Sequence, residues 1–145
     1  LLRVSRVLII NRQRRYCLPN NRLRQFGDIL SRYYQKDLGS FSVLLTTDKT
    51  LRRYNLLYRH LDEPTDILSF SSQFNEAPNL DRNYLGDMMI SVEFANRQAL
   101  AQNHSLEKEI KILMIHGWLH LKGWDHEVDQ GQMRRREMKL QRELL

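Results

Sequence analysis

Three histidines close to the C-terminal end have the residue type and the spacing that could hold a metal ion: His116, His120 and His126. His116 and His120 are four positions apart and would share one face of a helix. Gly123 can end that helix with a positive φ, so that the chain turns back towards His126. Neutral imidazole is the commonest side-chain ligand of Zn²⁺, and three protein ligands leave a fourth tetrahedral position for water or substrate. The spacing therefore predicts one catalytic Zn²⁺ site.

The helix that must position the first two histidines is predicted to begin after Ser105, which is a good N-cap. Glu107 and Glu109 fall in its first turn, where the helix dipole favours negative charge. Its apolar residues lie on more than one side, which predicts a buried helix. They are Ile110, Leu113, Met114, Ile115, Trp118, Leu119 and Leu121.

The rest of the chain predicts one domain over residues 1–145, without repeats or a linker. Residues 71–84 are polar, contain a proline and should form a loop. Strands are expected at 4–10, 41–45, 66–70 and 87–92, and further helices at 20–35, 48–58, 93–101 and 127–145. This order predicts an α+β fold in which about five or six helices pack on a small mixed four-stranded sheet, with the metal site on a central buried helix.

The charge distribution indicates a polyanionic partner. The net charge is +6, and seven arginines precede the first acidic residue, Asp28. Clustered guanidinium groups suit phosphate, so Arg3, Arg6 and Arg12 are candidate substrate-binding residues. The alternative is a solvated basic face without a partner. A second basic run, at 134–136, is a weaker indication because Glu137 and other acidic residues share its segment.

The composition also indicates the cellular compartment in which the protein works. The sequence has no uninterrupted apolar stretch of about 18 residues and no signal-peptide pattern, so neither a membrane span nor export is expected. A single cysteine, Cys17, cannot form an internal disulfide and is compatible with a reducing cytoplasm. We therefore expect a soluble cytoplasmic protein.

Arg59 is a candidate for binding substrate near the metal. It precedes a turn in which Pro64 disfavours helix and Asp66 can bond its own backbone, so the loop should be tightly shaped. An arginine held beside a metal could bind a phosphate and stabilise charge that develops on it. The alternative is an ordinary surface salt bridge between Arg59 and Asp62 or Glu63.

Three motifs resemble those of the YbeY family of bacterial rRNA maturation factors. They are Asn55-x-x-Tyr58-Arg59-x-x-Asp62-x-Pro64-Thr65-Asp66-x-Leu68-Ser69-Phe70, Leu85-Gly86-Asp87-x-x-Ile90-Ser91-x-Glu93-x-Ala95 and His116-Gly-x-Leu-His120-Leu-x-Gly123-x-Asp125-His126. They occur in this order and cover most of residues 55–126, and their combination is very specific. One departure is Ser71, where the family usually has proline.

The resemblance implies a zinc-dependent endoribonuclease specific for single strands, which acts in the cytoplasm in 16S rRNA 3′-end maturation and in ribosome quality control. It implies that His116, His120 and His126 bind one Zn²⁺ and that Arg59 is functionally important. The implied partners are single-stranded and ribosomal RNA, the small ribosomal subunit and its assembly proteins, with no membrane partner.

Two other functions share these residues. The histidine spacing is also that of the metzincin metalloproteases, but those have glutamate directly after the first histidine as general base, and here Gly117 follows His116. A noncatalytic, metal-stabilised ribosome assembly factor would have every motif. Asp125 could orient an imidazole or act as the base, or could cap a turn.

Overall fold

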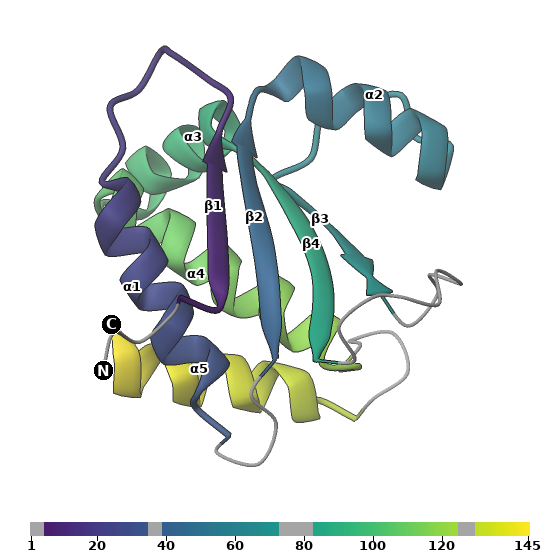
Figure 1. The fold of residues 1–145 in the computed structure, drawn as a ribbon. Coiled ribbons are helices and arrows are strands. Elements are labelled where there is room, and N and C mark those ends of the chain that lie inside the picture. Colours follow the sequence, from purple (N-terminus) through teal and green to yellow (C-terminus); the bar gives the residue numbers. More distant parts are fainter. Residues whose placement is uncertain (1–4, 35–38, 73–82, 125–129) are drawn as a thin grey trace.

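Strands and helices alternate in the first half of the chain, and helices follow one another in the second half (Figure 1). The computed structural model describes residues 5–34, 39–72, 83–124 and 130–145. The elements are β1 (Val7–Asn11), α1 (Asn20–Ser31), β2 (Ser40–Thr46), α2 (Asp48–Arg59), β3 (Ile67–Ser71), β4 (Tyr84–Ser91), α3 (Val92–Gln102), α4 (Leu106–Leu121) and α5 (Gln132–Leu144). None of the helices in these ranges is long and apolar enough to cross a membrane.

The strands form a mixed sheet in the order β1-β2-β4-β3. β1, β2 and β4 run parallel, and β3 pairs antiparallel with β4 at one edge. Phe41 in the middle of the sheet lies between Val7 of β1 and Gly86 of β4. The predicted α+β class and the mixed four-stranded sheet are confirmed, with five helices in the described residues.

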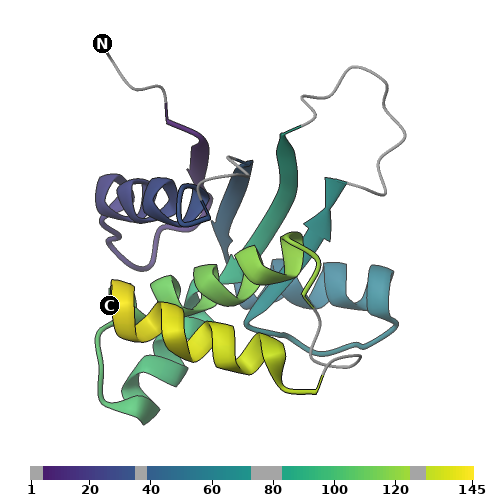
Figure 2. The same ribbon diagram turned by 90° about the horizontal axis from the view of Figure 1, so that it is seen from below.

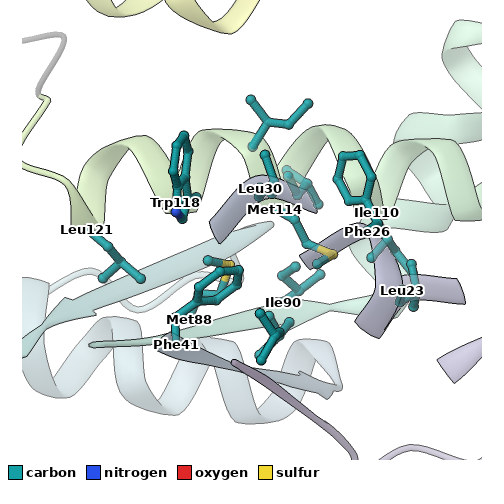
Figure 3. Packing of buried hydrophobic residues seen from close by; sticks show 14 of the residues in the cluster. Leu23, Phe26, Leu30, Phe41, Met88, Ile90, Ile110, Met114, Trp118 and Leu121 are labelled. Atoms are coloured by element: carbon teal, nitrogen blue, oxygen red, sulfur yellow. The ribbon is translucent and has the colours of Figure 1, made fainter. Parts of the chain in front are cut away.

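The two faces of the sheet bury different helices because successive side chains on a strand point to opposite sides. Val43 and Ile90 belong to the main core, which includes residues of α1, α3, α4 and α5, and Figure 3 shows α4 side chains packed against it. Leu44 and Met89 point the other way and pack with Leu51 of α2. In Figure 1, α2 lies away from α4 and α5. The sheet therefore separates α2 from α4.

Three helices begin at polar side chains that cap them. Ser105 accepts a hydrogen bond of 3.1 Å from the backbone N–H of Lys108, as predicted for the histidine helix. Thr47 and Ser91 cap α2 and α3 in the same way. A side-chain oxygen at this position satisfies an N–H that has no partner inside the helix, which is worth about 1 kcal/mol.

Several predicted boundaries are wrong. β4 begins at Tyr84 rather than residue 87, and α1 ends at Ser31 rather than residue 35. Past Ser31 the backbone N–H of Arg32 bonds the carbonyl of Ile29, which tightens the last turn and ends the helix. β1 begins at Val7; the expected start at Val4 lies outside the described residues, as does the expected start of the last helix at Glu127.

Candidate metal centre

The last turns of α4 lie close against the sheet because position 117 is a glycine. A Cβ atom there would lie 2.8 Å from Ile67 Cδ1 and 2.9 Å from Met88 Sδ. Next to it, Trp118 is fully buried and its ring stacks on Tyr34 at 5.7 Å between centroids. The predicted buried helix is confirmed, and its C-terminal half is held by β3, β4 and the segment that follows α1.

His116 and His120 point their Nε2 atoms at each other, 3.0 Å apart. Their rings stand edge to face with centroids 4.6 Å apart. Two nitrogens on one tetrahedral Zn²⁺, each about 2.0–2.1 Å from the ion, would be roughly 3.3 Å apart. The separation in this structure is within a few tenths of an ångström of that value. The two imidazoles therefore fit the metal site predicted from their spacing.

A carboxylate lies behind the first histidine. Glu137 of α5 contacts Nδ1 of His116 through Oε1. A carboxylate there can accept a hydrogen bond from Nδ1–H, which puts the lone pair of the imidazole on Nε2, the atom that would bind a metal; this arrangement is common around protein-bound zinc. Figure 2 shows α5 running beside α4 on the side away from the sheet. Sequence reasoning missed this residue.

Two other predicted site residues, Asp125 and His126, lie outside the described residues. The end of α4, just before these residues, has the predicted geometry. Gly123 has a φ of +96°, and its N–H bonds the carbonyl of His120 at 2.9 Å. The helix thus ends at the residue type that favours a positive φ. The described residues supply two imidazoles and the carboxylate behind one of them.

Arg59 ends α2 and is exposed. The alternative of a salt bridge to Asp62 is wrong, because Arg52 binds Asp62 with 2.7 Å between Nε and Oδ1 and lowers the pKa of that carboxyl. Among the described residues Arg59 has no ion pair, with Glu63 or any other acid. Its guanidinium is therefore available to a ligand.

Arg59 and the histidine pair flank the same edge strand from opposite faces of the sheet. The ring of Tyr58, next to Arg59, meets Phe70 of β3 at 5.2 Å between centroids, on the α2 side. Gly117, next to His116, approaches Ile67 of β3 on the α4 side. No described contact joins Arg59 to either histidine. A substrate that touched both would have to pass over β3.

Two of the three candidate arginines of the N-terminal segment, Arg6 and Arg12, lie at opposite ends of β1. Arg12 follows β1 at the carboxyl end of the parallel strands, whereas Leu121, at the end of α4, lies near Gly86 at their amino end. Arg6 precedes β1, across the sheet from β3, and Arg3 lies outside the described residues. The structure therefore does not gather Arg6 and Arg12 at the histidine pair.

Acidic residues from later helices also reduce the net positive charge around the arginine-rich N-terminal segment. Arg15 pairs with Glu93 at 3.4 Å, and Arg22 pairs with Glu107 at 2.7 Å. Both pairs are exposed, so they change the local charge more than the stability.

On α5, one acidic side chain faces into the protein and most of the basic side chains face solvent. Glu137 turns inwards to His116, and Glu143 accepts a hydrogen bond from Tyr33 Oη, which raises the pKa of that phenol to about 12. The exposed cations of the helix are Arg134, Arg135, Lys139 and Arg142. Glu143 is itself exposed and still offsets part of this charge, so among the described acids of α5 only Glu137 is withdrawn from the outer face.

Comparison with known proteins agrees with the sequence motifs. Residues 9–145 match the family model described as "Endoribonuclease YbeY". The "Endoribonuclease YbeY" of Heliobacterium modesticaldum is 43% identical over 119 residues, which is 75% of this chain and 72% of the relative. That of Geobacter metallireducens is 38% identical over 136 residues, covering 92% of this chain and 90% of the relative.

A solved structure shares the fold. The solution structure of TM1509 from Thermotoga maritima superposes with a TM-score of 0.63, covering 95% of this chain and 88% of the other at 24% sequence identity. At that identity the likeness supports the arrangement of the helices and the sheet and carries no information on activity.

Proposed function

The chain belongs to the YbeY family of endoribonucleases, and from this premise we propose that it is a Zn²⁺-dependent endoribonuclease specific for single-stranded RNA. The observation that carries the proposal is the pair of Nε2 atoms of His116 and His120, which converge at 3.0 Å. Its substrate would be ribosomal RNA, cut in the maturation of the 16S 3′ end and in ribosome quality control.

Each residue of the centre has a defined task in this proposal. His116 and His120 bind the metal through Nε2, and His126 is the proposed third ligand. A bound Zn²⁺ would supply a coordinated water of pKa about 7 and a Lewis acid for a phosphodiester oxygen. Asp125, beside His126, could orient an imidazole. The general base stays unassigned.

Positive charge around the centre would bind the RNA backbone. Arg59, which has no described acid partner, would hold a phosphate, and the basic outer face of α5 adds charge beside α4. Tyr58, next to Arg59, is 59% exposed and offers a ring on which an unpaired base can stack. Stacking needs an unpaired base, which supports the proposed preference for single strands.

We place this activity in the cytoplasm, with the small ribosomal subunit and its assembly proteins as partners. The metalloprotease alternative loses support because the Cβ of residue 117 would meet Ile67 and Met88, so glutamate does not fit there without movement of both. The noncatalytic assembly factor is the alternative that the experiment must separate.

The function can be tested with purified protein on two substrates, a single-stranded RNA and casein, each with and without a chelator. We expect RNA cleavage that is lost with the chelator and restored by Zn²⁺, a weaker effect on a duplex of the same sequence, and intact casein. Cleavage of casein would instead indicate a protease. If neither substrate is cut and the protein co-sediments with small ribosomal subunits, the assembly factor is the correct function.

Arg59→Ala should weaken both binding and cleavage. Loss of one phosphate contact reduces the salt dependence of single-strand binding by about 0.7 in the slope of log K against log salt. In the proposed complex the RNA passes over β3 and Arg59 holds the scissile phosphate, so loss of this cation should also lower kcat roughly 10²-fold. Binding to a labelled oligonucleotide at several salt concentrations, with metal removed, measures the first effect alone.

Arg53→Ala is the matched control, since Arg53 lies on the same helix, is exposed and contacts the Tyr54 ring. The control variant should keep the wild-type kcat. An Arg59→Ala protein with wild-type salt slope and kcat would show that Arg59 does not touch the RNA.

A further inference from the structure

Glu137 belongs to the face of α5 that packs into the protein. Met133 and Leu140 are 0% and 1% exposed, and together with Glu137 they occupy positions i, i+4 and i+7 of the helix. The Glu137 side chain is 16% exposed and meets the His116 ring, which is 32% exposed. The carboxylate is therefore held at its place by a buried residue on either side.

We propose that Glu137 is a positioning residue for the metal centre, holding His116 in the tautomer and orientation that direct its Nε2 to the ion. The inference rests on the proposed metal-dependent function. A neutral imidazole has one N–H and one lone pair, and an acceptor at Nδ1 assigns the proton to that atom. The lone pair then lies at Nε2, which faces His120 Nε2.

The carboxylate should strengthen metal binding in two ways. It restricts rotation of the His116 ring, so less conformational entropy is lost when the ion binds, and its negative charge makes the imidazole a better electron donor. Loss of such a partner commonly lowers metal affinity about 10- to 100-fold. The competing explanation is that the Glu137–His116 contact simply joins α5 to α4.

Glu137→Gln separates these explanations, and Glu143→Gln is its matched control. Both variants neutralise one acid on α5, but Glu143 bonds Tyr33 instead of a histidine. Zn²⁺ affinity is measured by competition with a chromophoric chelator, and the melting temperature is measured without metal. We expect a Zn²⁺ dissociation constant about 10- to 100-fold higher in Glu137→Gln. Glu143→Gln should bind Zn²⁺ as the wild type does.

Several outcomes would overturn the inference. Equal Zn²⁺ affinity in Glu137→Gln and the wild type would leave only a helix contact, and the proposed nuclease would stand. A weakened affinity shared by both variants would be an effect of net charge. A wild-type chain that binds no Zn²⁺ would overturn the metal centre itself and this inference with it.

A measurement on the wild type keeps the inference testable even if Glu137→Gln fails to fold. Nitrogen-15 NMR of the histidine rings in the Zn²⁺-loaded protein reports which ring nitrogen carries the proton. We expect the proton of His116 on Nδ1 and the metal on Nε2. The reverse assignment would overturn the proposal without any substitution.

Discussion

His120→Ala is expected to lower the cleavage of single-stranded RNA by about 10³-fold or more. The substitution removes one of the two nitrogens that converge at 3.0 Å, and the remaining ligands should hold Zn²⁺ poorly. A metal that stabilises charge in the transition state contributes several kcal/mol. Loss of about 4 kcal/mol corresponds to a 10³-fold slower reaction. Alanine is the best helix former, so α4 should still fold.

The measurement is the initial rate on a labelled oligonucleotide, with metal content determined on the same sample. His104→Gln is the control, because His104 contacts Glu109 at the other end of α4, whose first residue is about 15 Å along the helix from position 116. That variant should keep both its metal and its activity. Cleavage at the wild-type rate by a metal-free His120→Ala protein would reveal a contaminating nuclease or a reaction that does not use this site.

Gly86→Ala should be the most destabilising single-methyl change in the described part of the chain, costing about 3 kcal/mol or more. Its φ is +140°, and an added Cβ would lie 2.1 Å from the carbonyl oxygen of Phe70. Backbone strain and overpacking each cost roughly 1–3 kcal/mol, and here the obstacle is backbone that cannot rotate away. Because β3 pairs with β4 at this point, the edge strand beside both candidate sites should loosen.

Urea unfolding of the metal-free protein gives the free energy of unfolding for this comparison. Gly123→Ala separates strain from collision, since Gly123 also has a positive φ, +96°, but no described atom lies within 4 Å of its added Cβ. We expect a loss of about 1 kcal/mol for Gly123→Ala. If the two variants lose equal stability, the contact with Phe70 is not the cause.

The parts of the fold that were predictable depend on neighbours in the sequence. Ser105 and Thr47 cap helices because their oxygens reach an N–H three residues on. The start of β4 was missed because Gly86 interrupts the alternation of a strand. What holds this segment in the sheet is remote in sequence: Ser40 on β2 bonds the carbonyl of Asn83, and Phe70 on β3 pairs with Asp87.

The candidate site likewise contains residues that could be predicted from sequence neighbours and one that could not. The convergence of His116 and His120 follows from a spacing of four on a helix. Glu137 could not be found from spacing, because 21 residues separate it from His116 and it stands in a basic run that resembles a solvated surface.

Arg52 could not be predicted as the partner of Asp62, because the chain reverses at the end of α2. His60 has a φ of +60°, and the side chain of Asn55 donates a hydrogen bond to the carbonyl of Glu63 at 2.9 Å. The loop therefore runs back along the helix to Arg52.

The position of Glu137 on the last described helix has a consequence for the timing of activity during synthesis. α4 can fold on strands that have already left the ribosome, but the carboxylate behind His116 arrives only when residues 132–144 emerge and bury Met133 and Leu140. If Glu137 positions the metal centre as proposed, a nascent chain would display its histidines without a complete site. The nuclease would then gain full activity only after its own translation has passed α5, which would protect the messenger and ribosome that are producing it.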